Sequence, residues 1–267
     1  MKVGISTYAF FWQLNEKNDS PITVDEMLEV TKELGGEVFQ ICDYPLIEKM
    51  QEGELFSIAK KASELNIELE LGTRGVKPDH LLNYLRIANL LGVKLIRTMF
   101  NTVGDTPTTE QAYERLLAVL PKYEKAEVKL AIETYEQVKT KDIISVVERI
   151  DSPYVGICLD PGNTIAALEL PKDVVELSAP YVTNLHVKDF VFTRKSGWVG
   201  FSLVGCPLGE GLLDLDTMLK ALKRENRDVN AIIELWLPFT NSMEETIRLE
   251  KEWMRKSFDY LRGNLNE

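Results

Sequence analysis

The feature that most constrains the fold is an alternation of short apolar runs with longer amphipathic runs along all 267 residues. A short apolar run between turn signals predicts a buried strand, and a longer run of helical period predicts a helix. Strands that alternate with helices in this way form parallel sheets. The predicted strands are residues 2–8, 37–42, 67–72, 94–100, 129–134, 155–160, 182–188 and 230–236. The predicted helices lie near 24–34, 54–65, 78–91, 109–127, 140–150, 171–179, 214–225 and 244–262.

Eight strands and eight helices are what a closed barrel requires, so the predicted fold is α/β, a (β/α)8 TIM barrel, which typically takes roughly 250 residues. Local signals agree with the predicted helix ends. Thr23 and Glu26 form the pattern of a capping box, Pro78 and Pro171 suit first helical positions, and Gly92 suits a helix end. The chain shows no linker or shift in composition, so we expect a single barrel domain over residues 1–267.

Composition and charge exclude several classes of function. The net charge of −11 disfavours a nucleic-acid partner, which requires a basic surface. No apolar stretch is long enough to span a membrane, and the N-terminus lacks the pattern of a signal peptide. The three cysteines are widely spaced, which argues against a disulfide framework. We therefore expect a cytoplasmic protein that binds neither nucleic acid nor membrane.

Four polar residues end consecutive predicted strands: Glu133, Asp160, His186 and Glu234. In this type of barrel, active-site residues lie at the carboxyl ends of the strands. Three carboxylates and an imidazole at such spacing suit one divalent ion, and Mn²⁺, Mg²⁺, Co²⁺ and Zn²⁺ all remain open. Any one of them alone is more commonly a solvated carboxylate at a loop edge. Taken together, they predict a metal site, because without a cation they would repel one another.

Further candidates surround these four. Lys188 lies two residues after His186, so it faces the same side of its strand and either reaches the pocket or pairs outward with Asp189. The glycine-rich segment from Phe190 to Asp214 is expected to be a loop that folds over the site, or else a surface excursion. It contains Arg194, a candidate substrate contact. Trp236 is a candidate apolar wall for a sugar ring.

With these residues in place, the chain resembles the xylose-isomerase-like TIM-barrel superfamily, which includes the sugar phosphate isomerases and epimerases. The resemblance covers nearly the whole chain, and its most specific parts are Ile132-Glu133, Leu159-Asp160-Pro161-Gly162-Asn163, Leu185-His186-Val187-Lys188-Asp189 and the run from Pro207 to Asp214. It implies that Glu133, Asp160, His186 and Glu234 bind one divalent ion. It also implies that Glu133 and Glu234 move the proton on the carbon beside a carbonyl.

Two departures weigh against a strict 3-epimerase. Asn163 stands where those enzymes carry histidine, and Lys139 stands where they carry an acid. Other segments, Gln40 to Asp43, Gly72 to Gly75 and Asn184 to Asp189, are similar to a branch that acts on keto acids of branched sugars.

That second resemblance implies a metal-dependent decarboxylase of a 3-oxo sugar acid. Arg74 or Arg97 would then bind the substrate carboxylate, unless each serves only a salt bridge.

The first expectation is therefore a metal-dependent isomerase or epimerase of a small sugar, with Glu133, Glu234 and Lys188 as catalytic residues. Arg74, Arg97, Asn163, Arg194 and Trp236 are the expected substrate contacts. A decarboxylase is the alternative, and a non-catalytic sugar-binding regulator is the alternative of another class. The nuclease branch is excluded, because two histidines and a net charge of −11 do not suit a multi-metal DNA site. The expected partner is a small carbohydrate, and the aromatic residues of the last helix suit core packing or a homo-oligomer.

Overall fold

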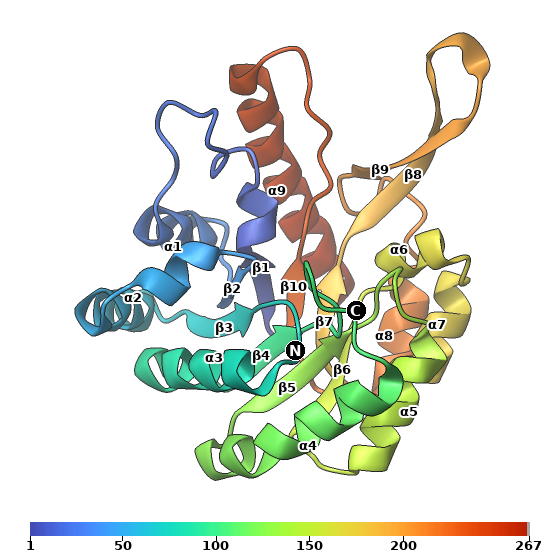
Figure 1. Ribbon diagram of the computed structural model, residues 1–267. Helices are drawn as coiled ribbons and strands as arrows, with labels where there is room; N and C mark the ends of the chain where they lie inside the picture. Colours follow the sequence, from blue (N-terminus) through green and yellow to red (C-terminus); the bar gives the residue numbers. More distant parts are fainter. Residues whose placement is uncertain (266–267) are drawn as a thin grey trace.

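The computed structural model describes residues 1–265 and confirms the barrel (Figure 1). Parallel strands close into a ring in the order β1, β10, β7, β6, β5, β4, β3, β2. Their bounds are β1 Val3–Ser6, β2 Val38–Cys42, β3 Glu68–Gly72, β4 Leu95–Thr98, β5 Lys129–Glu133, β6 Val155–Leu159, β7 Val182–Val187 and β10 Ala231–Ile233. Every predicted strand is present, each one to four residues shorter than predicted, and β10 differs most.

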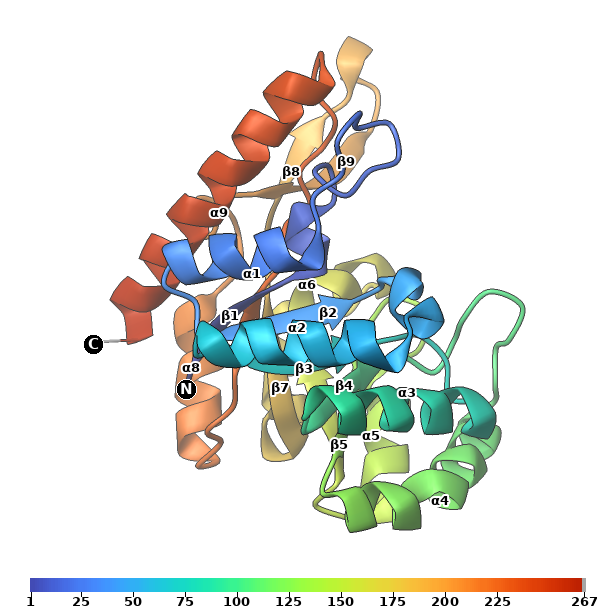
Figure 2. The same cartoon turned by 90° about the vertical axis from the view of Figure 1, so that its left-hand side faces the viewer.

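Helices surround the strands, as the view in Figure 2 also shows. They are α1 Val24–Glu33, α2 Glu52–Glu64, α3 Pro78–Leu91, α4 Thr109–Ala126, α5 Thr140–Ile150, α6 Pro161–Thr164, α7 Pro171–Ser178, α8 Leu215–Arg224 and α9 Met243–Leu265. The main apolar core lies where the strands meet this outer layer. Among residues 1–265, no helix is both long and apolar enough to cross a membrane. The single domain stays a prediction, and its last two residues lie outside the described residues.

The predicted helix ends are confirmed. The Thr23 hydroxyl accepts a hydrogen bond from the Glu26 amide, and the Glu26 carboxylate accepts one from the Thr23 amide. Pro78 and Pro171 occupy first-turn positions. Gly92 ends α3 with a φ of 73°, a left-handed conformation that glycine adopts without a Cβ clash.

The segment predicted to be a loop over the site contains a β-hairpin. Strands β8 (Asp189–Arg194) and β9 (Phe201–Cys206) pair antiparallel, from Asp189 opposite Cys206 to Arg194 opposite Phe201. Gly197 and Gly200 at the tip have φ of 78° and 83° and allow the chain to reverse. In Figure 1 the hairpin extends away from the barrel beyond the carboxyl ends of the strands, so the expected closed loop is corrected to a protruding arm. The glycines made the alternation of side chains along these two strands hard to recognise in the sequence.

Candidate metal centre and substrate cavity

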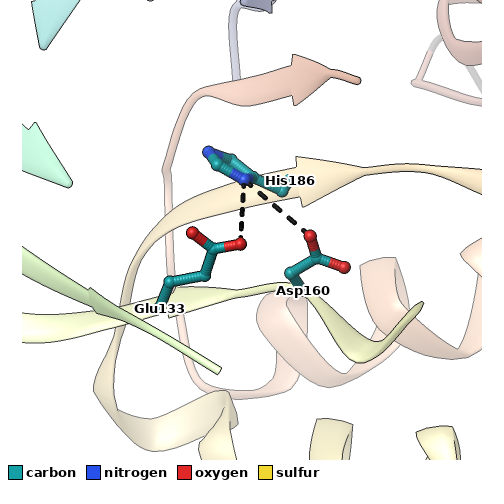
Figure 3. A group of neighbouring side chains, drawn as sticks. All are labelled: Glu133, Asp160 and His186. Carbon is teal, nitrogen blue, oxygen red and sulfur yellow. Dashed lines mark ion pairs between the residues drawn. The ribbon is translucent and has the colours of Figure 1, made fainter. Parts of the chain in front are cut away.

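The four strand-end residues converge at one point inside the mouth of the barrel. Glu133 ends β5, Asp160 follows β6, His186 lies in β7 and Glu234 follows β10, and these strands are neighbours in the ring. His186 Nδ1 lies 3.6 Å from Glu133 Oε1, 3.9 Å from Asp160 Oδ2 and 3.4 Å from Glu234 Oε1. Figure 3 shows the carboxylates of Glu133 and Asp160 pointing at this nitrogen.

The arrangement fits a divalent ion. Glu133, Asp160 and His186 each offer a ligand atom, and these atoms lie within 4.8 Å of one another. His186 Nδ1 is buried and has no hydrogen-bond partner among residues 1–265, which is costly for a polar atom unless something binds it. The hydroxyl of Ser6 donates to Glu234 Oε1 over 3.1 Å and orients that carboxylate. Oxygen donors with one imidazole suit Mg²⁺, Mn²⁺, Co²⁺ or Zn²⁺.

Lys188 lies in the same buried cluster. Its Nζ is 2.7 Å from Asp160 Oδ2 and 3.0 Å from Glu234 Oε2, and it sits 4.4 Å from the centre of the Trp236 ring. Burial alone would lower the pKa of Lys188, but the two carboxylates outweigh burial and raise it above its ordinary value. The side chain is therefore positively charged while it lies between these two carboxylates. It points into the cavity and does not pair with Asp189, whose carboxylate accepts backbone N–H groups.

The two candidate arginines differ in their surroundings. Arg97 is buried, forms an ion pair with Glu133 and donates to the Thr73 carbonyl over 2.9 Å. Arg74 is half exposed at the cavity and holds Asp43 through two bonds, of 2.9 and 2.6 Å. Asp43 also lies 3.5 Å from Arg97, so it links the two arginines. Its role was missed from the sequence, where nothing marks it as their partner.

This environment shifts the pKa values of the ionisable groups in different directions. Burial raises the pKa of Asp160 to about 6, against the opposing effect of Lys188. The pKa of Glu234 is lowered although burial opposes this, because His186 and Lys188 stabilise its charged form. Burial also acts to lower the pKa of His186, but Cys158 and the neighbouring carboxylates raise it well above its ordinary value.

A cavity of about 390 Å³ opens beside this cluster. It contains four of the five expected substrate contacts: Arg74, Arg97, Asn163 and Trp236. Asn163 Nδ2 donates to Glu133 Oε1 over 2.7 Å and to Asp160 Oδ2 over 3.0 Å, so it bridges two candidate ligands. The remaining lining residues are Tyr8, Asp43, Met99, Glu133, Tyr135, Glu136, Gln137, Ala166, Lys188 and Glu234.

Arg194 is not brought to this cavity. It lies on the β8–β9 hairpin, with its guanidinium 4.2 Å from the centre of the Phe201 ring. The hairpin geometry explains this placement, because Arg194 is the last residue of β8, and this strand leads away from the barrel (Figure 1).

Comparison with known proteins identifies the family of this chain. The family model described as "Xylose isomerase-like TIM barrel" matches residues 4–257. The chain belongs to this family. It is 51% identical over 261 residues to a Pectobacterium atrosepticum protein named 3-oxo-isoapionate decarboxylase, covering 98% of this chain and 95% of that one. An uncharacterized Escherichia coli protein, YihM, is 23% identical over 80% of this chain and 67% of its own length.

Solved structures show the same fold. A D-psicose 3-epimerase crystallised with D-fructose has a TM-score of 0.74 at 15% identity, covering 98% of both chains. An IOLI protein with a bound zinc atom has a TM-score of 0.70 at 18% identity, covering 97% of this chain and 99% of that one. The family and the 51% identical relative make the protein an enzyme of sugar metabolism. Of the two activities expected from the sequence, the name of the 51% identical relative supports the alternative, decarboxylation, better than isomerisation or epimerisation.

Proposed function

We propose that this protein is a divalent-metal-dependent decarboxylase of a 3-oxo sugar acid, with 3-oxo-isoapionate as the first substrate to test. The relative at 51% identity supports this substrate class. The observation in the structure that carries the proposal is the balance of charge in the cavity.

The metal centre is bordered by a network of four carboxylates and three cations, in which ion pairs form two groups, Arg74–Asp43–Arg97–Glu133 and Asp160–Lys188–Glu234, with His186 between them. The acids are Asp43, Glu133, Asp160 and Glu234, and the cations are Arg74, Arg97 and Lys188. With a neutral His186, this network has a net charge of −1. A divalent ion brings it to +1, and a substrate with one carboxylate then brings it to zero. Glu136 also lines the cavity, but it is exposed and its charge is screened by solvent, so these groups suit a substrate carboxylate better than a neutral ketose.

The chemistry breaks one carbon–carbon bond and makes one carbon–hydrogen bond. When the carboxylate of a 3-oxo acid leaves as CO₂, its bonding electrons move onto the 3-oxo group as an enolate. A bound divalent ion supplies the Lewis acid that stabilises this developing negative charge. Lys188 is the candidate donor of the proton that the enolate carbon then takes up, because its Nζ faces the cavity beside Glu234.

The arginines have separate roles in this proposal. Arg97 is enclosed by Glu133, Asp43 and the Thr73 carbonyl, so it holds Glu133 in place. Arg74 has its side chain 49% exposed, with guanidinium N–H groups left over after it binds Asp43. Arg74 is therefore the cation that meets the carboxylate of the incoming substrate.

The test is CO₂ release from 3-oxo-isoapionate by protein loaded with Mn²⁺, compared with EDTA-treated protein and with an Asp160→Ala variant. We expect release by the loaded protein and loss of activity in both of the others. Equal rates in all three samples would contradict a metal-dependent reaction.

A 3-epimerase is the second candidate, because Glu133 and Glu234 both border the cavity as a proton-transfer pair would require. Incubation with ketoses in D₂O separates the two functions. An epimerase exchanges the proton beside the carbonyl without losing carbon, whereas a decarboxylase leaves the ketose unchanged. A sugar-binding regulator would bind a sugar without either change.

A further inference from the structure

Beneath the metal centre, the barrel interior holds a group of buried polar side chains that the proposed reaction does not use. Gln40 of β2, Glu70 of β3 and Asn184 of β7 are at most 1% exposed. Branched apolar side chains usually fill this space in such barrels. A buried carboxylate is costly unless its environment satisfies it, so the presence of Glu70 needs a physical reason.

Glu70 accepts hydrogen bonds from three amide groups. Its Oε2 accepts from Gln40 Nε2 over 3.0 Å and from Asn184 Nδ2 over 2.9 Å. Its Oε1 accepts from Asn230 Nδ2 over 2.8 Å. A carboxylate has only acceptors to offer, so each of these amides must turn its NH₂ group toward Glu70.

This requirement determines the direction of Gln40. Gln40 Nε2 faces Glu70 and also donates to Asn184 Oδ1 over 3.2 Å, so both of its hydrogens have acceptors. The Gln40 carbonyl oxygen must then point the other way, toward His186 Nε2 at 2.9 Å. An amide oxygen only accepts, so the proton between them belongs to His186 Nε2.

The opposite ring nitrogen is thereby left for the metal. With its proton on Nε2, a neutral His186 has a lone pair on Nδ1, the nitrogen that faces Glu133, Asp160 and Glu234. The hydrogen bond made by one ring nitrogen decides which nitrogen binds a metal.

We propose that Glu70 is a positioning residue, which acts through Gln40 to hold His186 in the tautomer whose Nδ1 binds the metal ion. This inference rests on the proposed metal site. It assigns a function to a carboxylate that touches neither the candidate ligands nor the cavity.

The direct test uses the fact that the chain has only two histidines, His80 and His186. Protein labelled with ¹⁵N-histidine and loaded with Zn²⁺ gives NMR signals from two rings, and a His80→Gln variant assigns them. We expect the His186 ring to carry its proton on Nε2 and to bind zinc through Nδ1. A ring bound through Nε2 would overturn the inference.

Variants test the connection from Glu70 to His186. Gln40→Met removes the acceptor facing His186, and Glu70→Met removes the group that orients Gln40. Both should weaken Mn²⁺ binding by about 10- to 100-fold, the usual effect of losing an outer partner of a metal-binding histidine. Glu70→Gln should largely restore binding, because it can still present an oxygen to Gln40 while Asn230 rotates its amide.

Thr31→Val is the matched control, because it also removes a buried hydrogen-bonding group but lies in α1, away from the site. It should change stability without changing Mn²⁺ affinity. Unchanged affinity in folded Gln40→Met would overturn the inference even if Glu70→Met failed to fold.

Failure of the metal site itself would look different, because wild-type protein would then bind neither ion. If the wild type binds metal and releases CO₂ while Gln40→Met behaves normally, only the role of Glu70 and Gln40 fails.

Discussion

Replacing Lys188 with methionine removes the ammonium that separates the Asp160 and Glu234 carboxylates. The lysine is 3% exposed and lies 2.7 and 3.0 Å from the two oxygens. At an effective dielectric constant of about 20, each contact represents roughly 6 kcal/mol of Coulomb attraction before desolvation is subtracted. Removing one partner of a buried ion pair typically costs about 3–5 kcal/mol, since the remaining charge is left uncompensated. We expect the metal-free variant to lose about that much free energy of unfolding.

A divalent ion should reverse much of this loss, because it supplies positive charge to the same carboxylates. Urea unfolding of Lys188→Met is therefore measured in EDTA and in excess Mn²⁺, beside wild type. Lys188→Arg, which keeps the charge, is the control. The expected result is a large deficit in EDTA that shrinks when metal is present. Even when loaded, Lys188→Met should release CO₂ about 10²–10⁴-fold more slowly, the usual contribution of a proton donor.

Two results would refute this reasoning. A metal-free variant within about 1 kcal/mol of wild type would mean that Lys188 does not compensate the carboxylates. A deficit that metal leaves unchanged would mean that Asp160 and Glu234 do not meet the ion.

Three further predictions concern other parts of the molecule. Burial raises the pKa of Glu250 to about 7, against hydrogen bonds from Trp12 and Gln13. Because the folded pKa lies above the unfolded value of about 4.3, the stability due to Glu250 is complete at low pH and is lost as pH rises toward 7. The free energy of unfolding of Glu250→Gln, measured by urea unfolding, should therefore rise relative to that of wild type by up to about 3 kcal/mol between pH 5 and 8. If the two proteins show the same dependence of unfolding free energy on pH, this prediction is contradicted. Arg74→Met should raise the KM for the 3-oxo acid more than it lowers kcat, as steady-state kinetics would show; an unchanged KM would remove Arg74 from substrate binding. Gly4→Ala should lower the unfolding free energy by about 1–3 kcal/mol in urea titrations, because its Cβ would come within 2.6 Å of the strand β2 backbone, and a wild-type midpoint would be inconsistent with that packing.

The fold was predictable because each element carries its own local signal. The strand from Val155 to Leu159 is apolar throughout and buried throughout, and the period of two placed Lys188 on the same side as His186. The four candidate ligands were visible because polar groups end four consecutive predicted strands, the place where a barrel of this type carries its active site. These inferences needed only neighbouring residues and the geometry of a parallel barrel.

Partners distant in the chain were not predictable in this way. Nothing near Arg74 indicates that Asp43 holds it, and nothing near Glu70 indicates that Gln40 and Asn184 turn toward it. Those pairings depend on how strands from different parts of the chain are placed around the ring. Polar residues at inward positions in the middle of strands were the available signal for Gln40, Glu70 and Asn184. The position of Arg194 away from the cavity was not predictable for a related reason, since a glycine-rich loop and a protruding hairpin share the same composition.

The local sequence pattern also could not distinguish epimerisation from decarboxylation. Epimerisation and decarboxylation pass through similar enolates, so both require the same ligands. The arrangement of cations around the cavity, together with the relative at 51% identity, supports the acid substrate.

The most direct test of the central claim is a ¹³C NMR time course with Mn²⁺-activated protein and 3-oxo-isoapionate labelled at its carboxyl carbon, run in D₂O at catalytic protein concentration. The account predicts that the carboxyl signal is replaced by labelled CO₂ and bicarbonate, while the product gains one deuteron at the carbon that lost the carboxyl group. A carboxyl signal that persists while another carbon exchanges its proton would contradict decarboxylation and establish an epimerase instead.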